Sequence, residues 1–288
     1  MEHPFFSVII PTYNRRHFLK IAMESVLGQD FTDFELIVVD DGSTDGTKEM
    51  IQDYLGGRGQ GEGGRVKYFS QENKGPAAAR NRGVRESQGE YLCFLDSDDR
   101  FMRFKLSVTA EYIRRFPDLR VFHTEEIWYR DGKYLEPKGE HRKPEGWCFE
   151  QALRLCCVSP STVVVHRSVF DTVGFFDESF LSCEDYEFWL RVLHRFPIKL
   201  IPQFLTIKDG GRRDQQSQKY FGMDRFRFAA IEKIIPRLSG DQRRAALQML
   251  IEKGTIYYQG AIKRKKTDES LRYQDVIRRA REEIGNCD

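Results

Sequence analysis

The sequence has 288 residues, enough for one large domain with a sizeable core. Its 46 basic and 44 acidic residues leave a formal net charge of +2, so we expect no nucleic-acid partner. The six cysteines have no Cys-x-x-Cys spacing, which favours reduced thiols over a disulfide framework or a zinc site. The sequence shows neither a leader pattern nor eighteen consecutive apolar residues, so we expect a cytoplasmic protein without a membrane span.

Strands and helices alternate in the first hundred residues. Short apolar runs predict strands at residues 7–11, 34–39, 66–69 and 91–95, and the residues between them predict helices around 18–26, 50–55 and 76–83. We expect Asn14 to cap the first of these helices. This order predicts an α/β fold with a mostly parallel sheet flanked by helices, in which ligands collect beyond the carboxyl ends of the strands.

A glycine-rich run interrupts this alternation. It contains Gly59-x-Gly61-x-x-Gly64, the letters of a dinucleotide-binding fingerprint. Such a fingerprint lies between a strand and a helix, whereas this run follows a helix and precedes a strand. We therefore interpret it as a flexible linker.

The rest of the chain divides into a mixed segment and a helical one. In the mixed segment we expect helices at 103–116, 149–156, 167–173 and 186–193, and strands at 119–123, 126–129, 161–166 and 198–207. The last of these strands contains Pro202 and should lie at an edge of the sheet. Polar residues 131–146 are expected to form a mobile loop over the site. Further helices are expected at 223–235, 242–258 and 271–284, so we place one domain at 1–218, divided near residue 100, and a helical extension at 219–288.

The most informative stretch is the predicted strand 91–95 and the carboxylates that follow it. The strand is apolar and uncharged, which is typical of a strand covered on both faces. Asp96, Asp98 and Asp99 crowd its end, where like charges raise one another's pKa unless a cation or hydrogen-bond donors compensate them. Mg²⁺ and Mn²⁺ prefer such oxygen ligands. The pattern predicts a divalent-metal site, with a solvated turn as the alternative.

Two other acidic motifs do not match this stretch. An EF-hand loop starting at Asp96 would place Phe101 where glycine is needed and Ser107 where glutamate is needed. An aspartyl-phosphate phosphatase motif is disfavoured by Arg100, at a position where threonine or valine is expected.

Five segments, taken in order, carry a family resemblance. They are Ser7-Val-Ile-Ile-Pro-Thr-Tyr-Asn14, Phe34-Glu-Leu-Ile-Val-Val-Asp-Asp-Gly-Ser-Thr-Asp45, Asn73-Lys-Gly-Pro-Ala-Ala-Ala-Arg-Asn81, Leu95-Asp-Ser-Asp-Asp99 and Cys183-Glu-Asp-Tyr186. Together they resemble the family 2 inverting glycosyltransferases of the GT-A fold, over roughly residues 5 to 215. In that family a Rossmann-like first half binds a nucleotide-sugar and the second half receives the acceptor.

The resemblance implies a donor site and a cofactor. The donor-binding residues would be Pro11, Thr12, Tyr13, Asp41, Arg80, Asp96, Ser97 and Arg212. Tyr13 would stack on the base, Asp41 would accept the ring N–H of the base, and Arg80 would face the diphosphate. Asp98, together with Asp96, would hold a divalent metal, Mn²⁺ or Mg²⁺. UDP is the expected nucleotide, although dTDP and a guanine nucleotide also present a ring N–H to Asp41.

The resemblance also implies a catalytic base. Asp185 would take the proton of the acceptor hydroxyl, with Glu184 as its orienting neighbour, and the reaction would invert the anomeric centre of a hexosyl donor. Both carboxylates begin a predicted helix, where the helix dipole favours negative charge. Plain capping of that helix is the alternative.

Some features depart from the family pattern or stay open. Relatives often carry a histidine after the base where this chain has Arg212 and Arg213, which puts a third protein ligand to the metal in doubt. The three tryptophans Trp128, Trp147 and Trp189 offer either a sugar-stacking surface or core packing. The basic run Lys263-Arg-Lys-Lys266 is either a solvated turn or a peripheral contact with anionic lipid or a lipid-linked acceptor.

Two other functions compete with this interpretation. A nucleotidyltransferase would need a glycine-rich basic loop after the first strand, and Pro11-Thr-Tyr-Asn14 is not one. A non-catalytic nucleotide-sugar-binding or scaffold protein would not need Asp98 and Asp185, and both are present. The expected partners are therefore a nucleotide-sugar donor and a glycan or glycolipid acceptor.

Overall fold

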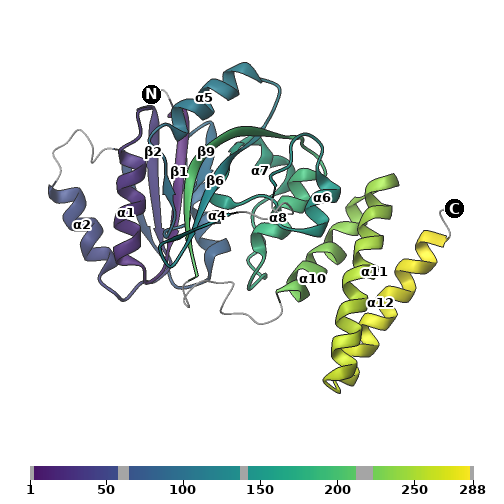
Figure 1. Ribbon diagram of the computed structural model, residues 1–288. Coiled ribbons are helices and arrows are strands. Elements are labelled where there is room, and N and C mark those ends of the chain that lie inside the picture. The colour runs from purple at the N-terminus through teal and green to yellow at the C-terminus, as the bar shows by residue number, and fades with distance from the viewer. Residues whose placement is uncertain (1–2, 58–64, 137–141, 212–222, 286–288) are drawn as a thin grey trace.

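The computed structural model contains a mixed sheet with helices on both faces (Figure 1). It describes residues 3–57, 65–136, 142–211 and 223–285. The strands of the described part are β1 (Phe6–Thr12), β2 (Phe34–Asp40), β3 (Val66–Ser70), β4 (Tyr91–Phe94), β5 (Arg100–Phe101), β6 (Val121–Arg130), β7 (Lys133–Leu135), β8 (Val163–His166) and β9 (Ile198–Gly210). They are ordered β3-β2-β1-β4-β8-β6-β9-β5, with β7 paired to β6. The linker interpretation of Gly59 to Gly64 falls outside the described residues.

Most of the long strands point in one direction. β3, β2, β1 and β4 are parallel neighbours. β8 runs antiparallel to both β4 and β6, so β6 and its parallel neighbour β9 again follow the direction of β1. The carboxyl ends of these strands therefore meet at one edge of the sheet, as the sequence predicts.

Helices cover the two faces of the sheet. The α-helices are α1 (Arg16–Leu27), α2 (Thr47–Gly57), α4 (Pro76–Glu86), α5 (Lys105–Arg115), α6 (Phe149–Arg154), α7 (Ser168–Val173), α8 (Glu184–Leu193), α10 (Asp224–Ile234), α11 (Gly240–Lys263) and α12 (Thr267–Gly285), and short 3₁₀ turns occupy η2 (Pro160–Thr162) and η3 (Ile235–Arg237). Alternate residues of β1 point to opposite faces: Val8 and Ile10 pack with α1, α2 and α5, and Ile9 packs with α4 and α8. β4 is buried along its whole length, which confirms the strand predicted to be covered on both faces.

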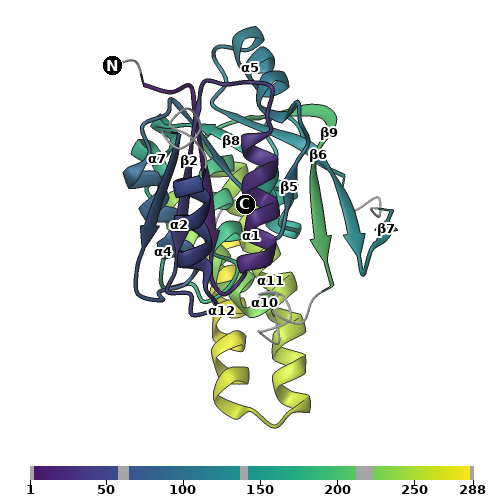
Figure 2. The same cartoon turned by 90° about the vertical axis from the view of Figure 1, so that its left-hand side faces the viewer.

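The C-terminal helices belong to one of these two apolar layers. Phe228 and Ile231 of α10, Leu247 of α11 and Val276 of α12 lie in the same buried cluster as Trp189 of α8. Trp189 is therefore core, whereas Trp128 and Trp147 are exposed. Figures 1 and 2 show α11 and α12 as an antiparallel pair that projects away from the sheet.

The structure corrects the prediction of an edge strand at 198–207. β9 pairs with β6 on one side and with β5 on the other. Thr124 of β6 pairs with Ile201, and the next residue, Glu125, pairs with Phe204, so the register shifts where Pro202 lies. A bulge accommodates proline because it interrupts the ladder of hydrogen bonds. The two short strands expected at 119–123 and 126–129 are one continuous strand, β6, because β9 pairs along its whole length.

The loop expected over the site at 131–146 has fixed ends. Residues 133–135 form β7, which pairs with β6, and the backbone of Gly146 pairs with that of Ile198. The side chain of Lys143 is buried and lies 3.3 Å from Glu126. The interpretation of a loop is therefore wrong for residues 133–135, which form a strand. Residues 137–141 are outside the described part, and the mobility of the loop stays a prediction.

Replacing Gly83 by alanine tests how closely α4 packs on the sheet. A Cβ atom at Gly83 would collide with the Cγ2 atom of Ile9 in β1. Overpacking of this kind costs about 1–3 kcal/mol, and the better helix propensity of alanine returns about 1 kcal/mol of it. We expect Gly83→Ala to lower the midpoint of urea unfolding. Gly56→Ala in α2 is the matched control, because its Cβ would meet nothing within 4 Å, and an equal loss in both variants would contradict the packing argument.

Candidate active site

The loops after β1 and β2 are clamped together at the carboxyl edge of the sheet. The side-chain oxygen of Asn14 accepts the backbone N–H of Thr44 (2.7 Å), and the N–H of Asn14 donates to the Ser43 hydroxyl (2.8 Å). The carboxylate of Asp45 accepts the backbone N–H of Arg16 in the first turn of α1 (2.9 Å). The prediction that Asn14 caps α1 is therefore wrong, because its side chain bonds the second loop and Asp45 satisfies the helix.

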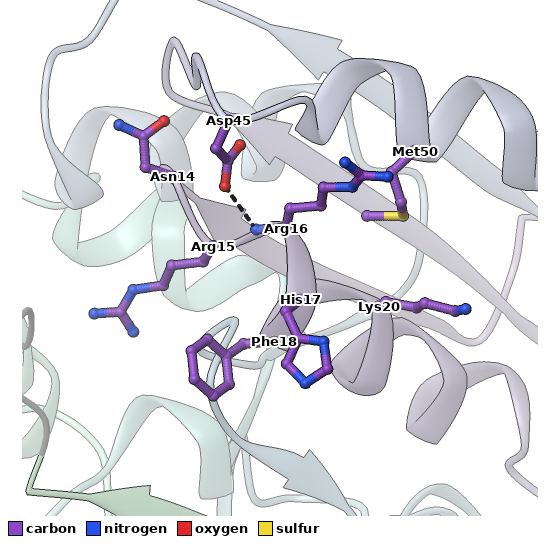
Figure 3. Close-up of a pocket in the computed structure, with 8 residues that line it drawn as sticks. All are labelled: Asn14, Arg15, Arg16, His17, Phe18, Lys20, Asp45 and Met50. Carbon is purple, nitrogen blue, oxygen red and sulfur yellow. Dashed lines mark hydrogen bonds between the residues drawn. The ribbon is translucent and has the colours of Figure 1, made fainter.

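A pocket of about 540 Å³ opens beside the start of α1 (Figure 3). It is lined by Asn14, Arg15, Arg16, His17, Phe18, Lys20, Asp45 and Met50. The side chains of Arg15 and Arg16 point to opposite sides in Figure 3. Arg15 reaches the carboxylate of Asp98, with 2.5 Å between Nη1 and Oδ2, so the pocket borders the acidic end of β4.

The residues predicted to bind the base lie at the ends of β1 and β2. Pro11 and Thr12 are buried, and Tyr13 is 43% exposed. The buried hydroxyl of Thr12 has no hydrogen-bond partner in the described part of the chain. The ring of Tyr13 is thus accessible for stacking, and a polar atom next to it is unsatisfied.

Asp41 is buried and already holds the start of α4. Its Oδ1 accepts from the Gln71 side chain (2.8 Å) and from the backbone N–H of Lys74 (3.0 Å), and its Oδ2 accepts the N–H of Gly75 (2.7 Å). A carboxylate has about four acceptor positions. One position therefore stays available for a ring N–H, and the base-binding role of Asp41 stays a prediction.

Burial changes the pKa of Asp99, one of the three aspartates after β4. Asp96 and Asp98 are partly buried, and Ser97 and Asp99 are buried. Burial raises the pKa of Asp99 to about 7; Lys208 opposes this shift, and the charges of Asp96 and Asp98 add to it. The Ser161 hydroxyl donates to the Asp99 carboxylate (2.6 Å). Asp99 is therefore a structural carboxylate that faces inward from the cluster.

Lys208 at the end of β9 compensates two of these carboxylates. Its Nζ lies 3.3 Å from Asp99, 4.0 Å from Asp96 and 3.0 Å from the Ser159 hydroxyl. Burial alone would lower the pKa of Lys208, but the neighbouring carboxylates, Asp99 first among them, raise it above its usual value. The same ammonium lies 5.6 Å from the ring of the exposed Trp128.

Arg80 joins the two halves of the site. Its Nη2 donates to Asp96 (2.9 Å) and its Nη1 donates to Glu184 at the start of α8 (2.7 Å). Arg80 is only 5% exposed, and its Nε has no hydrogen-bond partner in the described part of the chain. Burial would lower the pKa of Arg80, but Asp96 and Glu184 raise it. Arg80 therefore stays charged and connects the acidic end of β4 to α8.

Asp185 has a different environment from Glu184. Glu184 is buried against Arg80, whereas Asp185 is partly buried. The Oδ1 of Asp185 accepts the N–H of Tyr186 (2.7 Å), and its Oδ2 lies 3.7 Å from the Cys156 sulfur. Among the described residues, no lysine or arginine nitrogen lies within 4.0 Å of this carboxylate. Each oxygen of Asp185 thus accepts one hydrogen bond within the protein and can accept another, and the role of Asp185 as the base stays a prediction.

The acidic cluster fits a divalent cation only as a partial ligand set. Within the described ranges, no group of three His, Cys, Asp or Glu side chains converges on one point. Mg²⁺ is usually held by one or two carboxylates plus substrate phosphates, and Asp96 and Asp98 suit that arrangement. Each of these carboxylates is paired with a guanidinium, of Arg80 and Arg15 respectively. Arg212 lies outside the described residues.

Sequence reasoning missed Arg15, Lys208, Ser161 and Cys156. Arg15 directly follows the motif Pro11 to Asn14, so its place at a strand end was a usable signal. Lys208 comes just before the glycines at 210 and 211, where a cation beside an expected anion site also stands out. Ser161 and Cys156 gave no signal, because only the fold brings them to Asp99 and Asp185. The free cysteines expected from the sequence are confirmed for those in the described part.

The crystal structure of S. aureus TarS residues 1–349 in complex with UDP-GlcNAc has the same fold as this chain. The TM-score is 0.76 at 22% identity, over 96% of this chain and 81% of that chain. The fold is therefore that of the GT-A glycosyltransferases. The chain belongs to glycosyl transferase family 2, whose family model matches residues 7–173.

Two curated relatives are also similar in sequence. An uncharacterized glycosyltransferase of Rickettsia bellii is 34% identical over 189 residues, which are 66% of this chain but only 26% of that protein. The Escherichia coli enzyme WfgD, a UDP-Glc:alpha-D-GlcNAc-diphosphoundecaprenol beta-1,3-glucosyltransferase, is 28% identical over 197 residues, 67% of this chain and 71% of its own.

Removal of the Arg80 charge should destabilise the protein. Arg80→Met leaves Asp96 and Glu184 without their shared guanidinium, and breaking a buried ion pair from one side costs about 3–5 kcal/mol. We expect a matching fall in the free energy of unfolding measured with urea. Arg80→Lys, which keeps the charge but reaches one carboxylate at a time, should recover part of the loss. If Arg80→Met had the same free energy of unfolding as the parent chain, other cations would have to compensate both carboxylates.

Proposed function

We propose that this glycosyltransferase moves a hexosyl group from a UDP-sugar to a hydroxyl of a lipid-linked glycan, with inversion at the anomeric carbon. The observation that carries the proposal is the bridge through Arg80. It fixes the predicted donor carboxylate Asp96 relative to Glu184, and therefore relative to the neighbouring base Asp185. A donor at the strand ends and an acceptor at the start of α8 would meet across this bridge.

The choice of donor rests on the base pocket and the similar proteins. The accessible ring of Tyr13, the unsatisfied hydroxyl of Thr12 and the remaining acceptor position of Asp41 suit a planar base with a ring N–H. TarS is described in complex with UDP-GlcNAc, and WfgD is named for a UDP-glucose donor. The acceptor class follows the diphosphoundecaprenol-linked sugar in the name of WfgD.

Asp185 is the group that would move a proton. Its carboxylate lies in the first turn of α8. An acceptor hydroxyl in hydrogen-bond reach would give its proton to Asp185 as the oxygen attacks the anomeric carbon. Attack opposite to the departing diphosphate inverts that carbon in one displacement, so no covalent sugar-enzyme nucleophile is required.

Cations on the donor side would receive the leaving diphosphate. Arg15, Arg80 and Lys208 converge on the acidic end of β4. Guanidinium groups bind phosphate oxygens bidentately. A divalent cation held by Asp96 and Asp98 would add further stabilisation of negative charge without a proton. Exposed Trp128, next to Lys208, offers an apolar face for a sugar ring.

Thermal melting with nucleotides tests the donor site. We expect UDP with Mn²⁺ to raise the melting temperature of the parent chain by several degrees, because a ligand at a hundred times its Kd adds about 2.7 kcal/mol. dTDP, GDP and CMP should give smaller shifts. Asp98→Ala should lose the Mn²⁺-dependent part, and Asp118→Ala, an exposed aspartate remote in sequence from every motif, should keep it. If Asp98→Ala kept the full Mn²⁺-dependent rise in melting temperature, Asp98 would not be a ligand of the metal.

Turnover tests the base. We expect Asp185→Asn to lose about 10²–10⁴-fold in transfer rate, the usual contribution of a general base, while its UDP-dependent melting shift stays parental. The measurement is release of UDP in the presence of a diphosphoprenol-linked sugar. An active Asp185→Asn variant would assign the proton transfer elsewhere. A parent chain that binds UDP-sugar but never turns over would favour the binding or scaffold protein.

A further inference from the structure

The turn between α11 and α12 carries an exposed basic cluster with apolar residues beside it. Lys263, Arg264, Lys265 and Lys266 are all exposed. Ile262 directly before them is 52% exposed, Leu271 after them is 57% exposed, and Ile256 is 69% exposed. Ile256 and Lys263 are seven residues apart in α11, so they lie on the same face of the helix. We call this set, Ile256 to Leu271, the hairpin tip.

The hairpin tip contains four basic residues and two acidic residues, Asp268 and Glu269, so its net charge is +2. Lys266 pairs with Glu269 (2.6 Å). In the described part of the chain, no carboxylate lies within 4.0 Å of the other three cations. Lys266 lowers the pKa of Glu269 most, and the charges of Arg264 and of Arg225 in α10 lower it further. The tip therefore keeps an excess of positive charge on exposed side chains.

The hairpin tip faces the same direction as the active site. In Figures 1 and 2, the carboxyl ends of the parallel strands and the α11–α12 turn both lie on the lower side of the molecule, and the turn extends further down. α10 links the two. The Cys183 thiol, just before α8, donates to the backbone oxygen of Met223, just before α10 (3.8 Å). Arg225, in the first turn of α10, lies near enough to Glu269 of the tip to lower its pKa. A surface that touches the tip would thus lie on the acceptor side.

We propose that the hairpin tip docks on an anionic lipid bilayer. Exposed aliphatic side chains beside a cluster of lysines and arginines match the two contributions that bind proteins to such surfaces, which are apolar insertion and attraction to anionic headgroups. None of the described helices qualifies as a membrane span. The inference rests on the proposed function in one respect, since a lipid-linked acceptor is presented at a membrane.

Vesicle sedimentation without nucleotide or acceptor tests the tip separately from catalysis. We expect the full chain to bind phosphatidylcholine vesicles in which phosphatidylglycerol is about a third of the lipid, and to bind pure phosphatidylcholine much less. Arg264→Glu/Lys265→Glu should weaken binding to anionic vesicles by about tenfold or more, and added salt should have the same effect. Ile262→Asp should weaken it without changing the basic cluster.

A matched charge reversal serves as the control. Arg114→Glu/Arg115→Glu makes the same charge change at exposed positions of α5, on the opposite side of the molecule from the tip in Figures 1 and 2, and should leave vesicle binding unchanged. The tip variants should keep the UDP-dependent melting shift and parental transfer to a water-soluble acceptor, so a failed docking test leaves the proposed function standing. Equal vesicle binding by the parent and the Arg264→Glu/Lys265→Glu variant would overturn the inference.

Discussion

The rest of the site depends on one buried guanidinium. Arg80 comes from α4, yet its partners come from the end of β4 and the start of α8, which are 16 and 104 residues away along the chain. Because the group is almost fully buried, its charge must be matched, and the two carboxylates that match it are fixed in turn. The geometry between the end of β4 and the start of α8 therefore follows from an electrostatic requirement of the core.

The same requirement explains how the end of β4 tolerates three aspartates. Arg15, Arg80 and Lys208 approach this end from three different elements, and each contacts at least one of the carboxylates. Ser161 supplies a hydroxyl to the most buried of them, Asp99. The acidic cluster is thus stable as folded, and a metal and a diphosphate would bind to a site whose charges are already ordered. Such preorganisation reduces the rearrangement that accompanies bond breaking.

The sequence allowed much of this to be predicted, because its signals were local. The alternation of apolar runs and helical patterns placed the parallel strands, and the strand ends placed Asp41, Asp96 and Asp98 at one edge. The contacts of Arg80 with Glu184 and of Lys208 with Asp99 could not be predicted, since they join segments far apart in the chain. Pro202 misled for a related reason: its local preference fits an edge strand and a bulge equally well, and only pairing decides between them.

α8 and the C-terminal helices share one apolar core, and both lie beyond the residues that the family model matches. The family match ends at residue 173, but the apolar cluster that contains Trp189 continues through Phe228 and Leu247 to Ala280. A chain cut after β9 would expose that side of α8, including the support behind Asp185. In this protein the segment beyond the family match therefore shares the apolar core of α8, the helix that begins with Glu184 and Asp185.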